Sequence, residues 1–290
     1  MYQAAANGII VGAAYALVAL SFALIYRVTR FFNFAHGATY AVGAYLAFAM
    51  VHFFGLPIWA AVASGVGGAA ILGAAIQLLI YRRPMKRRAS SLVLLLASLG
   101  LYIVIQNIIS LVFGDDVKSL GIACFEGINI VGIRITAVQL AIMGSSLMSF
   151  VMVSALLRYT KFGKAYRATA SDPELALVRG VDTNRLVVGV FAIGSGLAGL
   201  AGILTALDVN MTPTMGLSAL MTGVIAMIVG GESSLLGIVL GALMLGLAQN
   251  LGIWKIGSEW QDSIAFTLLV VFVLLRPQGV MGKLSHKSRV

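Results

Sequence analysis

The chain has 290 residues, of which 60% are hydrophobic and 10% charged, and its formal net charge is +10. Soluble globular chains carry about 25% charged residues, so this composition cannot cover a water-facing surface and excludes a soluble enzyme or a disordered chain. It also excludes a nucleic-acid binder, because no polar face is available to present the positive charge. The sequence predicts an all-α fold, a polytopic membrane helix bundle.

Continuous apolar runs follow one another along the whole chain. A spanning helix needs about 20 mostly apolar residues, and runs without alternation exclude a β-barrel. We predict about nine spanning segments, at 7–26, 35–54, 58–81, 91–113, 138–157, 186–207, 217–230, 234–253 and 262–275. The run 217–230 is short, so we expect a broken or tilted helix there. The first eight residues carry no positive charge, which argues against a cleaved signal peptide.

The positions of Lys and Arg predict the orientation. With the N-terminus outside and the C-terminus inside, 17 of the 20 basic residues fall in cytoplasmic loops, and the opposite orientation reverses this ratio. The exceptions are Lys118, Arg134 and Lys255. Short cytoplasmic loops are enriched in Lys and Arg, so the N-terminus is expected outside. The positive charge then reflects topology and contact with the lipid bilayer.

The predicted outer loop, 114–137, has short apolar stretches broken by glycine, which favours a small hairpin or a surface helix. It contains Cys124, the single cysteine of the chain, so a disulfide framework and a multi-thiolate metal site are excluded. His36, His52 and His286 are too far apart in sequence to form a ligand-spaced pair. We predict no metal site and no cofactor.

The predicted inner loop, 158–185, contains the signals of a short helix. The Asp172 carboxylate can accept free backbone N–H groups, Pro173 suits the first helical position, and Glu174 complements the helix dipole. Gly180 can end the helix in a left-handed conformation. Two isolated turns are unstable in water. This helix must therefore rest on lipid headgroups or dock into a cytoplasmic partner, and its apolar residues and flanking cations favour docking.

Several motifs resemble the permeases of ATP-driven (ABC) importers. The spacing Glu174-Leu175-Ala176-x-x-x-Gly180 is similar to their E-A-A-x-x-x-G loop. The runs Asn33-Phe34-Ala35-His36-Gly37 and 194–202 resemble the branched-chain amino-acid permeases in particular, specifically the first of their two permease subunits, and the likeness covers nearly the whole chain. The family's usual Gly-Gly-Met-Gly-Ser is here Gly230-Gly231-Glu232-Ser233-Ser234, a departure that bears on the substrate. The I-x-L-P ending of the wider importer loop is absent.

The resemblance implies a permease subunit of the bacterial inner membrane that translocates branched-chain or similar small apolar amino acids, and not an enzyme. A second permease subunit would complete a heterodimer, two cytoplasmic ATP-binding subunits would dock on the inner loops, and a periplasmic substrate-binding protein would deliver the solute. Residues 1–290 would form a single transmembrane domain. The ATPase-coupling residues would be Asp172, Pro173, Glu174, Leu175, Ala176 and Gly180.

Polar residues inside a bilayer are costly and often functional. The candidates for a substrate path are Asn33, His36, Thr39, Ser98, Asn107 and Glu232. Discontinuous helices line many transport sites, and Gly37 is expected to interrupt the helix near Asn33 and His36. Structural roles compete with this interpretation: His36 as an interfacial or capping residue, polar groups on 91–113 as hydrogen bonds between helices, and Glu232 as a carboxylate in a turn.

The chain lacks a motif for nucleotide hydrolysis, G-x-x-x-x-G-K-[ST], and the common catalytic motifs. Switching between outward and inward openings needs about 5.5 kcal/mol of differential binding, which must come from a partner or an ion gradient. An ion-gradient-driven carrier of a small amino acid or amide such as urea is the alternative. Such carriers need buried carboxylates, and Asp208, Glu232 and Asp262 fall at predicted span ends, which favours a partner-driven permease.

Overall fold

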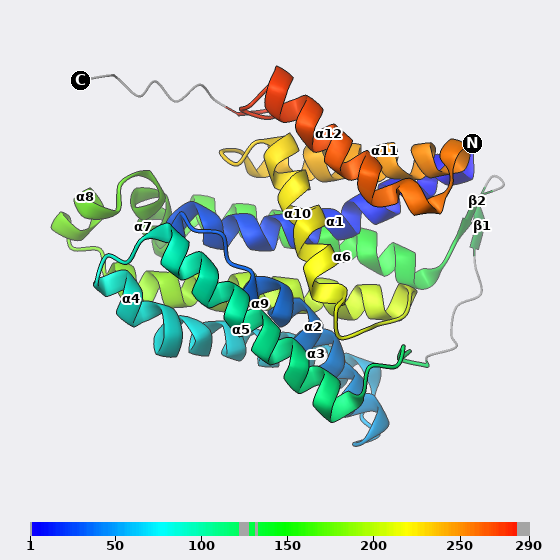
Figure 1. Cartoon of the computed structure of the whole chain (residues 1–290), viewed down its shortest axis with the longest axis horizontal. Helices are drawn as coiled ribbons and strands as arrows, with labels where there is room; N and C mark the ends of the chain where they lie inside the picture. The colour runs from blue at the N-terminus through cyan, green and yellow to red at the C-terminus, as the bar shows by residue number, and fades with distance from the viewer. Residues whose placement is uncertain (1, 122–127, 131–132, 283–290) are drawn as a thin grey trace.

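A computed structural model describes residues 2–121, 128–130 and 133–282. Cys124, Glu126 and His286 lie outside the described residues. The fold is almost entirely helical, and most long helices run along one direction (Figure 1). The elements are α1 (Tyr2–Thr29), α2 (Ala35–His52), α3 (Ile58–Ile76), the π-helical turn η1 (Gln77–Tyr81), α4 (Arg82–Lys86), α5 (Ser91–Phe113), β1 (Ile128–Ile130), β2 (Ile133–Ile135), α6 (Ala137–Tyr159), α7 (Lys161–Ser171), α8 (Pro173–Val178), α9 (Thr183–Asp208), α10 (Met215–Gly230), α11 (Leu235–Ile256), the 3₁₀ turn η2 (Ser258–Trp260) and α12 (Gln261–Leu275).

Each predicted apolar run coincides with a helix, but the helices differ in their capacity to cross a bilayer. By length and composition, seven helical segments among the described residues could span a membrane. The helices α2 and α10 are not among them, and α10 has only 16 residues. Both are largely buried against other helices. A helix surrounded by protein does not need the uniformly apolar surface that lipid demands of a peripheral helix.

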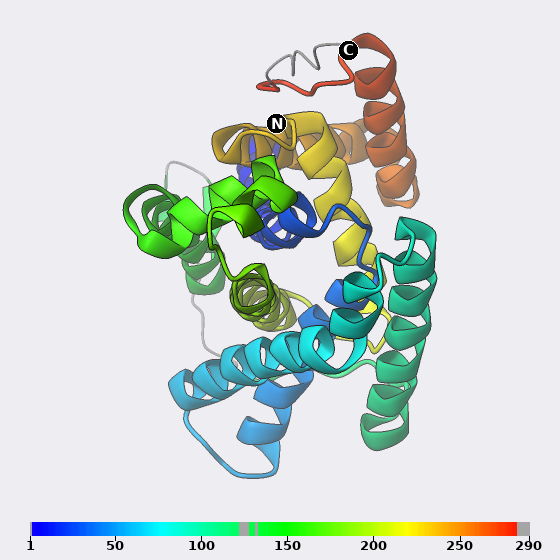
Figure 2. The same ribbon diagram turned by 90° about the vertical axis from the view of Figure 1, so that its left-hand side faces the viewer.

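The bundle has a protein-covered centre and a lipid-exposed rim. In the most apolar 18-residue windows, 78% of α1 and 72% of α9 are buried, against 6% in the η2–α12 segment. Viewed along the bundle, α1 and α9 lie near the middle while α5 and α12 lie at the periphery (Figure 2). The central pair therefore forms the scaffold on which the other helices pack.

Glycines set the shortest distances between helices. A Cβ atom on Gly43 of α2 would collide with the backbone of Gly199 of α9, and one on Gly65 of α3 would come 2.6 Å from the Gly43 carbonyl oxygen. A Cβ on Gly12 of α1 would come 2.8 Å from the Cα of Leu243 in α11. Gly8 lies equally close to α11, with an added Cβ 2.9 Å from the Cα of Leu247, so the Gly8-x-x-x-Gly12 spacing lets these two helices pack closely.

In the described part of the outer loop, residues 128–130 and 133–135 form a hairpin. Strands β1 and β2 pair antiparallel, with Ile128 opposite Ile135 and Asn129 opposite Arg134. The side-chain amide of Gln3 holds this hairpin to the start of α1, because it donates to the Arg134 carbonyl at 3.0 Å and accepts from the Arg134 N–H at 2.9 Å.

Candidate functional site

The connection between α1 and α2 turns back into the bundle. His36 Nε2 lies 2.8 Å from the hydroxyl oxygen of Ser21. Ser21 lies eight residues, or about 12 Å, before the end of α1, so the chain returns alongside α1 before α2 begins. The interruption falls in residues 30–34, before α2 begins. The expectation that Gly37 breaks the helix is wrong. Gly37 is helical, and its missing Cβ admits α10, since a Cβ there would come 2.6 Å from the Gly216 carbonyl oxygen.

Buried polar side chains satisfy the backbone of this re-entrant connection. The Ser98 hydroxyl accepts from the Phe34 N–H at 3.0 Å and lies 3.3 Å from the Phe32 carbonyl oxygen. The Tyr81 hydroxyl donates to Asn33 Oδ1 at 2.9 Å. Irregular backbone at membrane depth is tolerated only where protein or water supplies its hydrogen bonds. Ser98 thus has a defined structural task, together with the buried Asn33.

His36 and Thr39 extend this buried cluster along α2. The Thr39 hydroxyl donates to the His36 carbonyl at 2.8 Å, and both residues are buried. The structure therefore brings together four of the predicted path residues. Sequence reasoning missed Ser21 and Tyr81. Ser21 was detectable as a polar residue within an apolar run, whereas nothing in the sequence pointed to a π-helical turn that carries Tyr81 into the core.

Asn107 and Glu232 lie apart from the cluster. Asn107 is exposed on α5 and donates to the Ile103 carbonyl of its own helix at 2.8 Å. Glu232 lies in the turn between α10 and α11, where its carboxylate is 3.7 Å from the Arg30 guanidinium. Both side chains of this ion pair are half-exposed, and surface pairs of this kind contribute roughly 0–1 kcal/mol.

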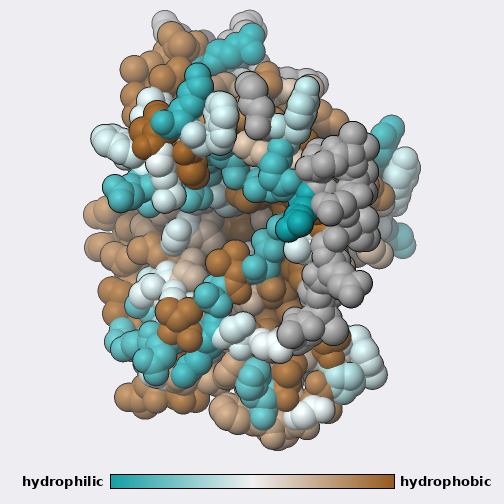
Figure 3. Space-filling model, turned by 90° about the vertical axis from the view of Figure 1, so that its right-hand side faces the viewer, coloured by the Kyte–Doolittle hydropathy of each residue, from teal (hydrophilic) through white to brown (hydrophobic). Residues whose placement is uncertain are grey.

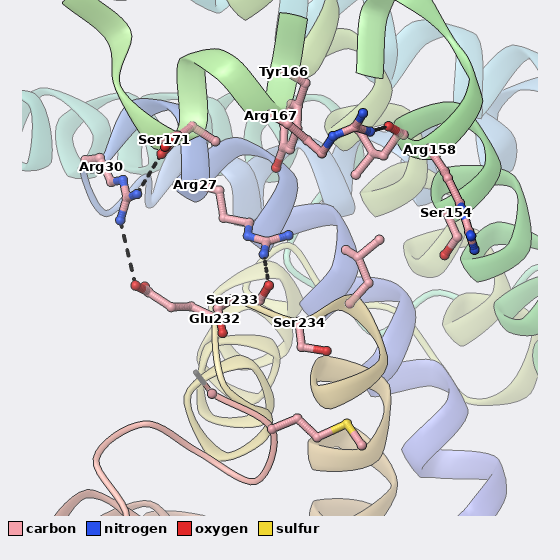
Figure 4. Close-up of a pocket in the computed structure, with 15 residues that line it drawn as sticks. Arg27, Arg30, Ser154, Arg158, Tyr166, Arg167, Ser171, Glu232, Ser233 and Ser234 are labelled. Carbon is pink, nitrogen blue, oxygen red and sulfur yellow. Dashed lines mark hydrogen bonds and ion pairs between the residues drawn. The ribbon is translucent and has the colours of Figure 1, made fainter. Parts of the chain in front are cut away.

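Glu232 lines an arginine-rich cavity, which we call the arginine pocket. It consists of two adjoining spaces of about 1000 and 970 Å³ that share Arg30 and Glu232. Figure 4 shows the arginines of α1, α6 and α7 around the first space, with Arg27 donating to the Ser233 carbonyl. The pocket's four arginines are Arg27, Arg30, Arg158 and Arg167.

Tyr166 fixes α7 beside this pocket. Its hydroxyl donates to the Leu24 carbonyl at 3.1 Å, and burial raises the pKa of Tyr166 to about 12. The phenol therefore keeps its proton at physiological pH. This contact ties the cytoplasmic-loop helix α7 to the central helix α1.

A second cavity, the acidic pocket, lies where α9 ends and α12 begins. Its volume is about 560 Å³, and its lining, taken over the described residues, includes Asp208, Glu259 and Asp262 but no Lys or Arg. Hydrophilic side chains gather across this end of the molecule (Figure 3). Within the described residues no group of three or more His, Cys, Asp or Glu could hold a metal ion. The lining also offers hydroxyl groups from Tyr15 and Thr222.

The segment with the predicted helix signals forms α7 and α8. Asp172 Oδ1 accepts from the N–H groups of Glu174 and Leu175, both at 3.0 Å, and Gly180 adopts φ +82°. The predicted cap, helix and terminator are confirmed. The Ala176 side chain is buried against the rest of the chain. The apolar residues around it point outward, with exposed fractions of 49% for Leu175, 54% for Leu177 and 85% for Val178.

The chain matches the family described as "Branched-chain amino acid transport system / permease component" over residues 4–274. It is 32% identical to the high-affinity branched-chain amino acid transport system permease protein LivH of Salmonella typhimurium strain LT2 and of Escherichia coli K12, covering 96% of this chain and 94% of each relative. It is 30% identical to BraD, the corresponding permease protein of Pseudomonas aeruginosa PAO1, covering 97% of this chain and 95% of that protein.

Among solved structures, PsaBC from Streptococcus pneumoniae in complex with Fab aligns with a TM-score of 0.54 at 14% identity, over 96% of this chain and 92% of that one. At this identity the likeness concerns the fold alone. The family match and the full-length relatives carry the assignment, and those relatives are transport permeases. The chain is a multi-pass membrane protein that belongs to the permease component family of branched-chain amino acid transport systems.

Proposed function

We propose that this chain is the membrane permease subunit of an ATP-driven importer that carries branched-chain or similar small apolar amino acids across the bacterial inner membrane. The observation that carries this proposal is the 32% identity to LivH over 96% of the chain. A second permease subunit, forming a heterodimer, two cytoplasmic ATP-binding subunits and a periplasmic substrate-binding protein complete the proposed assembly.

The proposed topology has nine spans in one domain of residues 1–290, with the N-terminus outside and the C-terminus inside. The seven spanning candidates and the protein-covered helices α2 and α10 support the span number. Grouping of the predicted cytoplasmic arginines around α1, α6 and α7 supports the orientation.

The proposed contact with the ATPase is α8 and its flanks, Asp172 to Gly180. A six-residue helix is unstable by itself, and here the Asp172 cap and the buried Ala176 hold it. Its exposed Leu175, Leu177 and Val178 form an apolar knob at the end of the molecule. Apolar anchors that enter a partner's pocket carry most of the energy of an interface, so docking fits this surface better than solvent exposure.

The lack of buried carboxylates among the described residues supports a partner, rather than an ion gradient, as the energy source. Of the described residues, no Asp or Glu is buried. Ion-coupled carriers bind protons or sodium at intramembrane carboxylates. The buried polar groups here are neutral side chains such as Ser21, Asn33 and Ser98.

The test is uptake of labelled leucine, isoleucine and valine into proteoliposomes that contain the chain with its copurified partner subunits and the substrate-binding protein. We expect uptake only with enclosed ATP. Uphill uptake by the purified chain alone, driven by a proton or sodium gradient, would overturn the proposal.

If α8 contacts the ATPase, a negative charge at an exposed valine should weaken docking when the valine lies on α8 but not when it lies in the outer loop. Val178→Asp on α8 should weaken ATPase docking by roughly 30-fold, which corresponds to about 2 kcal/mol at a hot spot. The matched control is Val117→Asp in the outer loop, where the side chain is 62% exposed. Copurification of the ATPase and ATP-driven uptake are the measurements. Equal behaviour of the two variants contradicts the contact.

A second variant alters the ends of the same helix. Glu174→Lys places a cation at the positive end of the helix dipole, and Gly180→Leu puts a branched side chain at φ +82°. The double variant should insert normally but uncouple ATP hydrolysis from uptake. Unchanged uptake would remove residues 172–180 from the mechanism.

A further inference from the structure

Four arginines that are far apart in the sequence converge on the arginine pocket. Arg27 lies in the last turn of α1, and Arg30 directly follows that helix. Arg158 lies in the last turn of α6, and Arg167 lies on α7. Glu232 is the single carboxylate among the described lining residues, so the lining has a formal charge of four minus one, or +3. The enrichment of cytoplasmic loops in basic residues does not require that these residues meet in one cavity.

Each guanidinium has more hydrogen-bond donors than its contacts within the described chain use. Arg27 and Arg167 donate to backbone carbonyls, which do not neutralise a positive charge. Arg30 lies 3.7 Å from the Glu232 carboxylate, whereas Arg158 lies on the opposite side of the pocket from Glu232 (Figure 4). A guanidinium presents five N–H donors in a planar fork that suits bidentate contact with a phosphate. The side of the pocket that holds Arg158 is therefore open to an anion.

An exposed apolar stripe on α6 leads into this side of the pocket. Counted from Leu147, the residues Val151, Ser154 and Arg158 follow at offsets of four, seven and eleven, which places all four on one face of the helix. Leu147 and Val151 are 65% and 56% exposed, while Ser154 and Arg158 line the pocket. A molecule that lies along this face contacts apolar side chains first and cations at the end of the helix.

The end of α6 has the features of a membrane interface. The helix has 23 residues, or about 35 Å, which is enough to cross the hydrocarbon core of about 30 Å. Tyr159 at its last position is 75% exposed, and the Arg158 guanidinium lies 5.6 Å from the centre of the Tyr159 ring. Aromatic side chains gather at the level of the lipid headgroups. In the proposed orientation this level is the cytoplasmic leaflet.

Three kinds of anion suit four arginines: a free phosphate, an acidic segment of a protein, and the phosphodiester of an anionic phospholipid. The phospholipid accounts for the apolar stripe as well as for the charge, because it carries acyl chains. The surface proposed for the protein partner is α8, and none of its residues is among the described residues that line the pocket. Basic pockets between spanning helices on the cytoplasmic side bind the headgroups of anionic lipids.

We propose that the arginine pocket binds the phosphodiester headgroup of an anionic phospholipid of the cytoplasmic leaflet, with an acyl chain along Leu147 and Val151 of α6. The bound phosphate links the end of α1 to α6 and α7 and offsets the repulsion among the arginines. Cardiolipin, which has two phosphodiesters, matches the pocket's formal charge more closely than phosphatidylglycerol, which has one. This inference rests on the orientation within the proposed function and not on the solute that is carried.

The first experiment measures lipid binding to the purified, assembled importer by native mass spectrometry, which needs no transport assay. The delipidated complex receives cardiolipin, phosphatidylglycerol or phosphatidylethanolamine with the same acyl chains. We expect cardiolipin to bind most tightly and phosphatidylethanolamine most weakly, because the ammonium group of the latter is repelled by the arginines. Equal binding of the three lipids would overturn the site.

Two variants test whether the binding occurs in the pocket. Arg158→Gln with Arg167→Gln should lower the affinity for cardiolipin about 30-fold, which corresponds to about 2 kcal/mol. Ser154→Asp keeps all four arginines and should also weaken binding, because its carboxylate competes with the lipid phosphate for them. The matched control, Arg82→Gln with Arg83→Gln, removes the same charge from exposed positions of α4 outside the pocket and should leave the affinity nearly unchanged. Equal losses in pocket and control variants would overturn the site.

A further arm separates the lipid from the other two anions. A ligand that binds the folded state raises the temperature of unfolding, so we expect cardiolipin to stabilise the complex and inorganic phosphate or glycerol 3-phosphate not to do so. Equal stabilisation by inorganic phosphate would overturn a lipid site. If Ser154→Asp abolishes copurification of the ATPase while lipid binding is unchanged, the pocket is a protein contact and the lipid site is wrong.

The outcomes distinguish this site from the proposed function. Unchanged cardiolipin affinity in both pocket variants overturns the lipid site while ATP-driven amino-acid uptake stands. Lipid binding that depends on the pocket arginines, in a complex that transports no branched-chain amino acid, overturns the proposed function while the lipid site stands.

Discussion

Glycine has opposite consequences in the centre and at the rim of this bundle. Gly43 of α2 lies against the backbone of Gly199 in α9, and Gly199 lies against Ala69 of α3, so neither glycine has room for a Cβ. Gly100 of α5 and Gly144 of α6 lie in equally apolar stretches, yet a Cβ on either would meet no atom within 4 Å. The comparison teaches that a glycine in an apolar run marks helix contact only where a second helix lies against it.

The largest effect should come from filling the central contact. Gly43→Leu inserts four carbons against the Gly199 backbone and should lower the free energy of unfolding in detergent by about 3 kcal/mol or more. Gly100→Leu is the control and should be neutral or slightly stabilising, because leucine favours helix more than glycine does. Thermal unfolding followed by size-exclusion chromatography measures both. Comparable losses in the two variants would break the distinction between centre and rim.

A smaller effect should separate two polar residues of α5. Ser98→Ala leaves the Phe34 N–H and the Phe32 carbonyl without this partner, at a cost of about 1–3 kcal/mol. Asn107→Ala removes only a bond to its own helix and should change stability by less than about 0.5 kcal/mol. Denaturant unfolding of the two variants tests this, and a larger loss for Asn107→Ala would contradict it.

The smallest effect concerns one hydrogen bond of the central connection. Tyr81→Phe keeps the ring, which packs edge-on against Phe31 at 5.2 Å, but loses the 2.9 Å bond to Asn33. The expected loss is about 1 kcal/mol. Tyr102→Phe is a control, since its hydroxyl reaches the Thr214 carbonyl only at 3.5 Å. The same unfolding assay applies, and a loss for Tyr102→Phe that equals or exceeds that of Tyr81→Phe would sink the assignment.

Local signals predicted the short cytoplasmic helix well. The Asp172 cap, Pro173 at the first position and Gly180 with positive φ act within a few residues of themselves, so their types and spacing suffice. The polar candidates Asn33, His36, Thr39 and Ser98 were also found, because a polar side chain in an apolar run is conspicuous. Their task was not predictable, since it depends on a contact between α5 and the connection before α2, which are 64 residues apart in sequence at Ser98 and Phe34.

The amino-acid sequence alone determined the membrane class, the positions of the apolar helices and the ends of α8, because hydropathy and capping act over short distances along the chain. Only the tertiary structure decided that residues 30–34 re-enter the bundle, that Glu232 pairs with Arg30 and that four separate arginines line one pocket. These features arise where separate helices meet. Which helix faces meet depends on how side-chain shapes fit across the contact, and the sequence of one segment alone does not determine this fit.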